Sequence, residues 1–154
     1  MSVAFRRESD EEHLEPKFEL PLPPGPNLVT PRGLLLIEVR NAELEAAVAA
    51  ATPAQLPELQ RDQRYWRKRL ATAQLASPPS GEIVAFGTTV TIQQDGGIRI
   101  LDIVGHDESN PANGRIAFSA PLAKALIGSE LGEEVDPPGP GGPITIVGIA
   151  VRND

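Results

Sequence analysis

The chain of 154 residues contains no cysteine, which excludes disulfide bonds, thiolate metal sites and cysteine nucleophiles. No apolar run approaches the ~20 residues that a membrane-spanning helix requires. The N-terminal region, with two arginines followed by a run of acids, lacks the apolar core of a signal peptide. These absences predict a soluble, cytoplasmic protein that does not enter a membrane.

Basic residues are outnumbered by acidic ones, which gives a formal net charge of -7. Phosphate backbones repel such a protein, so we expect it not to bind free DNA and to bind a protein partner instead. Histidine is also scarce, with only His13 and His106. A hydrolase built on His106, Asp107 and Ser109 is an alternative, but neighbours in sequence seldom have the convergent geometry of a catalytic triad.

Prolines and glycines divide the chain into three segments. Residues 1–29 are charged and then proline-rich, which predicts an extended or disordered arm. Residues 30–77 carry helical periodicity and predict an antiparallel coiled-coil hairpin. The stiff segment SPPSG at residues 77–81 then marks a boundary, after which residues 78–154 show the alternation of a small β domain.

The helical segment begins with Thr30 as a cap and Pro31 at the first helical position. Its seam residues are Leu34, Ile37, Asn41, Leu44 and Val48. A second helix is expected to restart at Thr52 or a few residues later, with Gln55 completing a capping box. Its seam residues are Leu56, Leu59, Gln63, Trp66, Leu70 and Ala73. The short link makes the helices antiparallel and places Asn41 opposite Gln63 as a polar pair that fixes the register.

Strand signals follow at residues 83–92 and 98–104, separated by the turn sequence DGG at residues 95–97. Further strands are predicted at residues 115–118 and 144–151. Between them, Ser119 and Pro121 open a short helix that ends at Gly128.

Three stretches resemble the GreA/GreB family of bacterial transcription elongation factors. Residues 119–128, SAPLAKALIG, are similar to the family signature S-x-P-x-A-x-x-L-I-G, and residues 103–108, IVGHDE, to its I-V-G-x-D-E segment. Residues 27–34, NLVTPRGL, resemble the start of the first helix in GreB-like members. The resemblance implies an α+β fold, with an N-terminal antiparallel helical hairpin followed by a small FKBP-like antiparallel β domain that carries one short helix.

In that family the β domain docks on the rim of the RNA polymerase secondary channel, and the hairpin reaches toward the polymerase active site. The resemblance therefore implies bacterial RNA polymerase as the partner. It places the polymerase-binding residues in the two β-domain motifs, at Asp107, Glu108, Ser119, Ala120, Pro121, Leu122 and Ala123. The simpler interpretation of residues 119–127 is a helix that only packs on the sheet.

Acidic residues at the hairpin tip of the family help to hold a magnesium ion that activates water for transcript cleavage. In this chain the link AAATPAQLPE at residues 49–58 contains one carboxylate, that of Glu58. Magnesium needs several oxygen ligands in near-octahedral geometry, so we expect no metal site, no cofactor and no catalytic residue. Helices of roughly 20 residues also span only about 30 Å, less than the family's usual arm.

Basic residues crowd the second helix, and Arg61, Arg64 and Lys68 are candidates to face nucleic acid inside the polymerase. We favour the simpler interpretation of a solvated face paired with acids such as Glu38 and Glu45 on the first helix, since such pairs are common and weak.

The sequence thus predicts a monomeric binding protein that regulates elongation at the secondary channel without cleaving RNA. A factor that still stimulates cleavage, with Glu58, Asp62 or polymerase carboxylates as ligands, is one alternative. Another is a regulator that acts outside the channel, like the Rnk-type relatives, whose hairpin is also short. Prolyl isomerase activity, suggested by an FKBP-like fold, needs an aromatic-lined pocket, and this domain has only Phe86 and Phe118.

Overall fold

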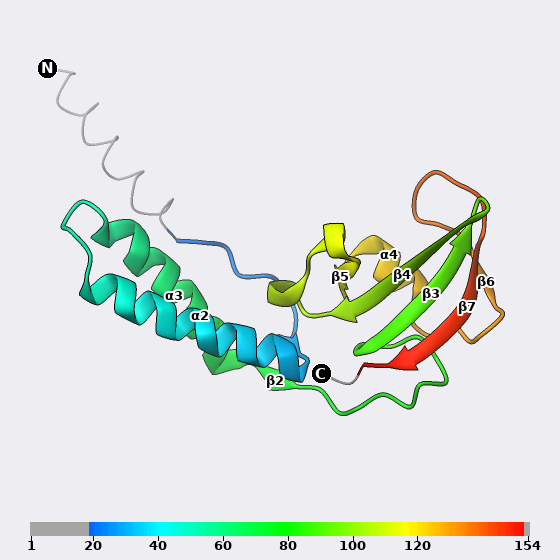
Figure 1. Ribbon diagram of the computed structural model, residues 1–154, viewed down its shortest axis with the longest axis horizontal. Coiled ribbons are helices and arrows are strands. Elements are labelled where there is room, and N and C mark those ends of the chain that lie inside the picture. Colours follow the sequence, from blue (N-terminus) through cyan, green and yellow to red (C-terminus); the bar gives the residue numbers. More distant parts are fainter. Residues whose placement is uncertain (1–18, 153–154) are drawn as a thin grey trace, which may run out of the picture. The chain divides into compact units, whose positions relative to one another are not determined.

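The computed structural model describes residues 19–152 (Figure 1). Within this range, contacts group the chain into a helical unit of residues 19–25 and 37–72 and a β unit of residues 26–36 and 73–152. The β unit therefore includes residues 26–36 and 73–77, which the sequence had placed with the arm and the hairpin. The first 18 residues of the predicted arm lie outside the described residues, and residues 19–27 form no helix or strand.

Helices α2 (Pro31–Ala49) and α3 (Leu56–Thr72) lie side by side and antiparallel, as predicted (Figure 1). The hydroxyl of Thr30 caps α2 by accepting a hydrogen bond of 3.0 Å from the backbone N–H of Gly33. Before α3, the Thr52 backbone N–H donates to the side-chain oxygen of Gln55 at 2.9 Å, which is half of the expected capping box. No helix within residues 19–152 is long and apolar enough to cross a membrane.

The seam of α2 follows the predicted spacing, because Ile37 and Leu44 are fully buried. Asn41 is the polar position of this seam. Its side-chain amide donates hydrogen bonds of 2.9 Å to the carbonyl oxygens of Ile37 and Trp66. The polar contact that fixes the register thus runs from a side chain to the backbone of α3, rather than to the side chain of Gln63.

In α3 the predicted seam is wrong at its C-terminal end. Leu70 is 37% exposed, whereas its neighbour Arg69 is only 3% exposed. The Arg69 guanidinium lies 6.0 Å from the centre of the Tyr65 ring, within the range of a cation–π contact. Arg69 therefore takes the buried position that the sequence had given to Leu70, with its aliphatic stem packed in the seam and its charge on the Tyr65 ring.

The β unit contains a five-stranded sheet in the order β5-β4-β3-β7-β6. The strands are β3 (Thr88–Gln94), β4 (Gly97–Val104), β5 (Arg115–Ala117), β6 (Glu134–Val135) and β7 (Ile144–Val151). Because β4 and β5 run parallel, the sheet is mixed and not purely antiparallel as predicted. A separate parallel pair, β1 (Leu28–Val29) with β2 (Gln74–Leu75), was not predicted.

Strands β3 and β4 form the predicted hairpin, in which Gln94 pairs with Gly97. The two turn residues Asp95 and Gly96 have φ angles of 50° and 80°, as a type I′ turn requires. The strand expected from residue 83 begins only at Thr88, and Ile83 makes an isolated bridge to Glu130 instead.

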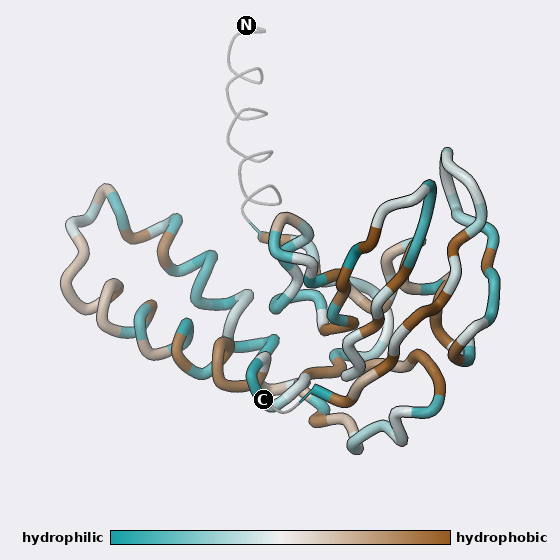
Figure 2. The backbone as a smooth tube through the Cα atoms, turned by 45° about the vertical axis from the view of Figure 1, so that its right-hand side comes forward, coloured by the Kyte–Doolittle hydropathy of each residue, from teal (hydrophilic) through white to brown (hydrophobic). Residues whose placement is uncertain are grey.

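Helix α4 (Pro121–Leu126) covers one face of this sheet, where its Ala123 and Leu126 join the core. Core residues occupy alternate positions along β3, β4 and β7, and residue hydropathy alternates along these strands (Figure 2). They are Val90, Ile92, Leu101, Ile103, Ile144 and Ile146. The helix therefore begins as predicted, although Ala120 rather than Ser119 is its cap.

Candidate functional site

The two β-domain motifs meet at one edge of the sheet. Strands β4 and β5 are parallel, so the segments that follow their carboxyl ends, residues 105–109 and 118–121, emerge side by side. The first forms a short 3₁₀ helix η1 (His106–Glu108). The His106 ring joins the two segments, because its Nε2 lies 3.2 Å from the Ser119 hydroxyl and its ring packs edge-on against Phe118.

The seven residues predicted to bind a partner differ in their exposure. Pro121 is exposed, and Asp107, Ser119, Ala120 and Leu122 are half-buried. The prediction needs correction at two positions, since Glu108 is 5% and Ala123 0% exposed. Their side chains point into the β unit and are not available to a partner. The remaining five define what we call the docking edge.

Glu108 instead forms the centre of a buried polar network within the β unit. Its Oε1 accepts a hydrogen bond of 2.5 Å from the Thr30 hydroxyl, and its Oε2 lies 3.1 Å from a guanidinium nitrogen of Arg152. The side chains of Glu108 and Arg152 are 1% and 6% exposed. The network ties together the cap of α2, the loop after β4 and the end of β7.

The same loop approaches the N-terminal strand too closely for any residue other than glycine. A Cβ atom on Gly105 would lie 2.3 Å from the carbonyl oxygen of Leu28 in β1. The glycine of the IVGHDE motif therefore has a packing role, which the motif alone does not reveal.

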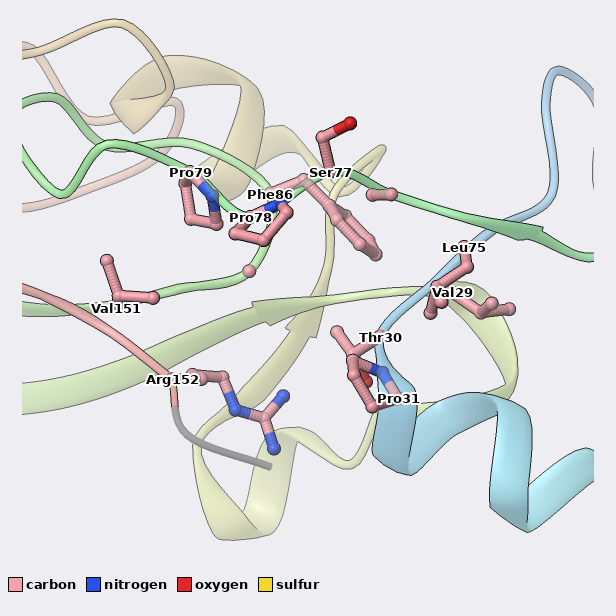
Figure 3. A pocket seen from close by; sticks show the side chains of 12 residues that line it. Val29, Thr30, Pro31, Leu75, Ser77, Pro78, Pro79, Phe86, Val151 and Arg152 are labelled. Atoms are coloured by element: carbon pink, nitrogen blue, oxygen red, sulfur yellow. The ribbon is translucent and has the colours of Figure 1, made fainter.

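An apolar cavity of about 190 Å³ lies in the β unit near β1 (Figure 3). Its walls come from the start of α2, the proline linker before β3, Phe86 and the end of β7. Among the residues that the structure describes, Arg152 is the only charged one that lines it. The cavity therefore offers apolar surface but no pair of titratable groups for catalysis.

The hairpin tip carries two carboxylates, Glu58 and Asp62, and both pair with Arg61. A guanidinium nitrogen of Arg61 lies 2.9 Å from Asp62 and 3.8 Å from Glu58. Among residues 19–152, no group of three or more histidine, aspartate or glutamate side chains is placed to hold a metal ion. Two carboxylates that share a cation are a poor ligand set for magnesium, so the tip does not fit the ion that the family resemblance implied.

The three basic residues predicted to face nucleic acid have different surroundings. Arg61 is occupied at the tip, and Arg64 is bound by Glu19 from the segment before α2. Lys68 is exposed one turn further along α3. Within residues 19–152, Arg61 and Arg64 pair with Glu58, Asp62 and Glu19, and none of these acids is on the first helix, where the sequence had suggested Glu38 and Glu45.

Glu19 holds the Arg64 guanidinium through both carboxylate oxygens, with Nε donating at 3.2 and 3.0 Å. The hydrogen bond from Arg64 is the main cause of a lowered pKa of the Glu19 carboxyl, and the same bond raises the pKa of Arg64. Sequence reasoning missed this contact because 44 residues separate the partners.

Proteins often bind other macromolecules through loops at a sheet edge or through a basic helix face. The family model described as "Transcription elongation factor, GreA/GreB, C-term" matches residues 79–152. Transcription elongation factor GreB of Xanthomonas axonopodis pv. citri is 31% identical over 150 residues, which cover 80% of this chain and 89% of that protein. The chain therefore belongs to the GreA/GreB family of transcription elongation factors.

Other relatives match over shorter stretches. GreA of Desulfovibrio desulfuricans is 35% identical over 95 residues, which cover 58% of this chain and 59% of that protein. GreA of Bacillus cereus is 39% identical over 72 residues, 46% of each chain. The chain thus spans about half the length of these GreA relatives. Among solved structures, the GreA factor homolog 1 (Gfh1) protein of Thermus thermophilus aligns over 81% of this chain and 99% of its own, with 18% identity and a TM-score of 0.41.

Proposed function

We propose that this protein binds bacterial RNA polymerase at the rim of the secondary channel and regulates elongation without stimulating transcript cleavage. It has no catalytic activity of its own in this proposal. The observation that carries it is the charge pairing at the hairpin tip, where Arg61 lies against both Asp62 and Glu58. A magnesium ion would have to displace the guanidinium and would still find only two protein carboxylates.

The docking edge is the surface that we propose for polymerase. It combines the exposed ring of Pro121 with the half-buried side chains of Asp107, Ser119 and Leu122. An apolar centre with a polar rim is the usual composition of a specific protein interface. Its backbone is held by the β4–β5 pairing and by the Glu108 network beneath it, so little order has to be gained on binding.

The basic face of α3 supplies a second contact in this proposal. The exposed Lys68 lies one turn along α3 from the half-exposed Arg64, whose guanidinium is bound by Glu19, so both basic groups are on the same side of the hairpin. Each phosphate contact of this kind is electrostatic and therefore weakens with salt.

The test is competition on backtracked polymerase complexes. We expect excess protein to suppress RNA cleavage stimulated by a GreA relative, while the protein alone adds no cleavage. Replacing Pro121 by glutamate should weaken suppression about tenfold, which corresponds to roughly 1.4 kcal/mol. Pro138→Glu is the matched control, because it makes the same change at an exposed proline far along the chain in the loop before β7.

A lack of suppression at concentrations far above those at which GreA acts would refute the proposal. So would equal effects of the two proline variants, since the docking edge would then have no special part in binding.

A cleavage-stimulating factor is the second candidate, because the Glu58 side chain is 76% exposed and its contact with Arg61, at 3.8 Å, is long for an ion pair. Its carboxylate is accessible enough to join ligands supplied by polymerase. If the wild-type protein stimulates cleavage and the double variant Glu58→Gln with Asp62→Asn does not, this second candidate is correct.

A further inference from the structure

The segment before the hairpin makes an unexpected contact with the basic face of α3. Within the helical unit, residues Glu19, Leu20 and Leu22 line one side of a groove. The other side comes from Arg64, Tyr65, Arg67, Lys68 and Ala71 of α3. The groove thus combines apolar surface from leucine and tyrosine with three positive charges, and among the described residues Glu19 is the only acidic group that lines it.

The charge of α3 makes this contact electrostatically favourable. The helix contains five basic and two acidic residues, and the acidic pair, Glu58 and Asp62, is occupied by Arg61 at the tip. No described acidic side chain forms an ion pair with Arg67 or Lys68. Glu19 therefore brings a carboxylate to a positive patch, and it binds Arg64 in the two-oxygen geometry with which guanidinium groups also bind phosphate.

The segment is also stiff, because prolines stand at positions 21, 23, 24 and 26. Proline restricts φ and holds such a chain extended, so less conformational freedom is lost when Glu19 settles on Arg64. A tethered carboxylate of this kind has a high effective concentration at its site, even though an exposed ion pair is weak by itself.

We propose that residues 19–22 are an autoinhibitory strap, in which Glu19 occupies the place of an anionic phosphate on Arg64 and must leave before the α3 face binds nucleic acid. This proposal rests on the proposed binding of nucleic acid by the basic face of α3, and it does not depend on docking to polymerase. Free in solution, the protein then binds polyanions weakly, in keeping with its net charge of -7. A ligand that offers several phosphates exchanges one internal ion pair for contacts with Arg64, Arg67 and Lys68.

The test measures binding of a fluorescent single-stranded RNA 20-mer to the full chain by anisotropy at low salt. Glu19→Gln removes the strap charge but keeps the side-chain size, and we expect about two- to fivefold tighter binding, the range of an exposed ion pair. Glu45→Gln is the matched control, because it removes the same charge at an exposed position of α2. Its effect should stay below about 1.5-fold, since salt screens distant charges. Arg64→Gln should weaken binding.

A second measurement follows the strap itself through the titration of the Glu19 carboxyl by NMR. The pKa of Glu19 is lowered in the free protein, and RNA should return it toward its ordinary value by taking over Arg64.

The outcomes separate the strap from the site that it covers. If Glu19→Gln and Glu45→Gln raise affinity equally, or RNA leaves the Glu19 titration unchanged, the strap is refuted while the basic face stands. If no variant binds RNA, or Arg64→Gln binds as well as wild type, the basic face itself is refuted and the strap with it.

Discussion

Removing the Glu108 carboxylate should destabilise the β unit strongly. In Glu108→Ala, the Arg152 guanidinium loses the carboxylate oxygen that lies 3.1 Å from it in the intact protein, where the Arg152 side chain is 6% exposed. The Thr30 hydroxyl also loses its acceptor. Breaking a buried ion pair from one side costs about 3–5 kcal/mol, because the remaining buried charge loses an oppositely charged group in contact with it, and we expect a loss in this range.

A double-mutant cycle separates the ion pair from general packing. Arg152→Ala should cost about as much as Glu108→Ala, and the double variant should cost about 1–3 kcal/mol less than the sum, because each single variant already removes the same ion pair. Glu108→Gln keeps the acceptor for Thr30 and lacks only the charge, so its loss should lie between those of wild type and Glu108→Ala.

The suitable assay is urea unfolding in which the amide exchange of β3 is monitored, because this buried strand reports on the stability of the β unit. The only tryptophan, Trp66, belongs to the helical unit and reports on that unit instead. A loss below about 1 kcal/mol for Glu108→Ala, or losses that simply add in the double variant, would show that the network does not stabilise the fold as argued.

Three further outcomes follow from the described contacts. Gly105→Ala should lower the free energy of unfolding by about 1–3 kcal/mol or more in urea titrations, because its Cβ would lie 2.3 Å from the Leu28 carbonyl oxygen. Arg69→Ala should destabilise the hairpin by about 1–2 kcal/mol more than Leu70→Ala, as measured by Trp66 fluorescence, because Arg69 is 3% and Leu70 37% exposed. The Glu19–Arg64 contact should be present at neutral pH and lost as pH falls through the lowered pKa of Glu19. NMR should therefore show the Glu19 carboxyl titrating below the usual range of a glutamate, and Arg64→Gln should return its pKa to that range.

The elements that could be predicted from the sequence are those with a local cause. Thr30 and Pro31 start α2 because a hydroxyl cap and a fixed φ act within one turn, and the turn after Gln94 forms because Asp95 and Gly96 accept positive φ. The last strand was predicted at its observed bounds, residues 144–151, since a run of β-branched residues after a proline–glycine stretch gives both its start and its type.

The parts that were missed depend on residues far apart in the chain. Strands β1 and β2 contain two residues each, too few to show any alternation, and they pair across 46 positions. Glu108 looked like a surface residue of a polar loop because its counter-ion, Arg152, stands 44 positions later. Neither the charge of Glu108 nor the small side chain of Ala123 reveals burial in the sequence, so both residues were included in the predicted binding surface although their side chains are interior.

The stretch that defines the family is therefore smaller than the unit that folds. The family model begins at residue 79, but the β unit also includes residues 26–36 and 73–78. Strand β1 lies against Gly105, and the Thr30 hydroxyl completes the polar partners of Glu108. The 3₁₀ turn that holds Asp107 is thus fixed by the residues that start α2. Because one buried carboxylate serves both the loop of the docking edge and the cap of the first helix, neither can change its local structure without a cost to the other.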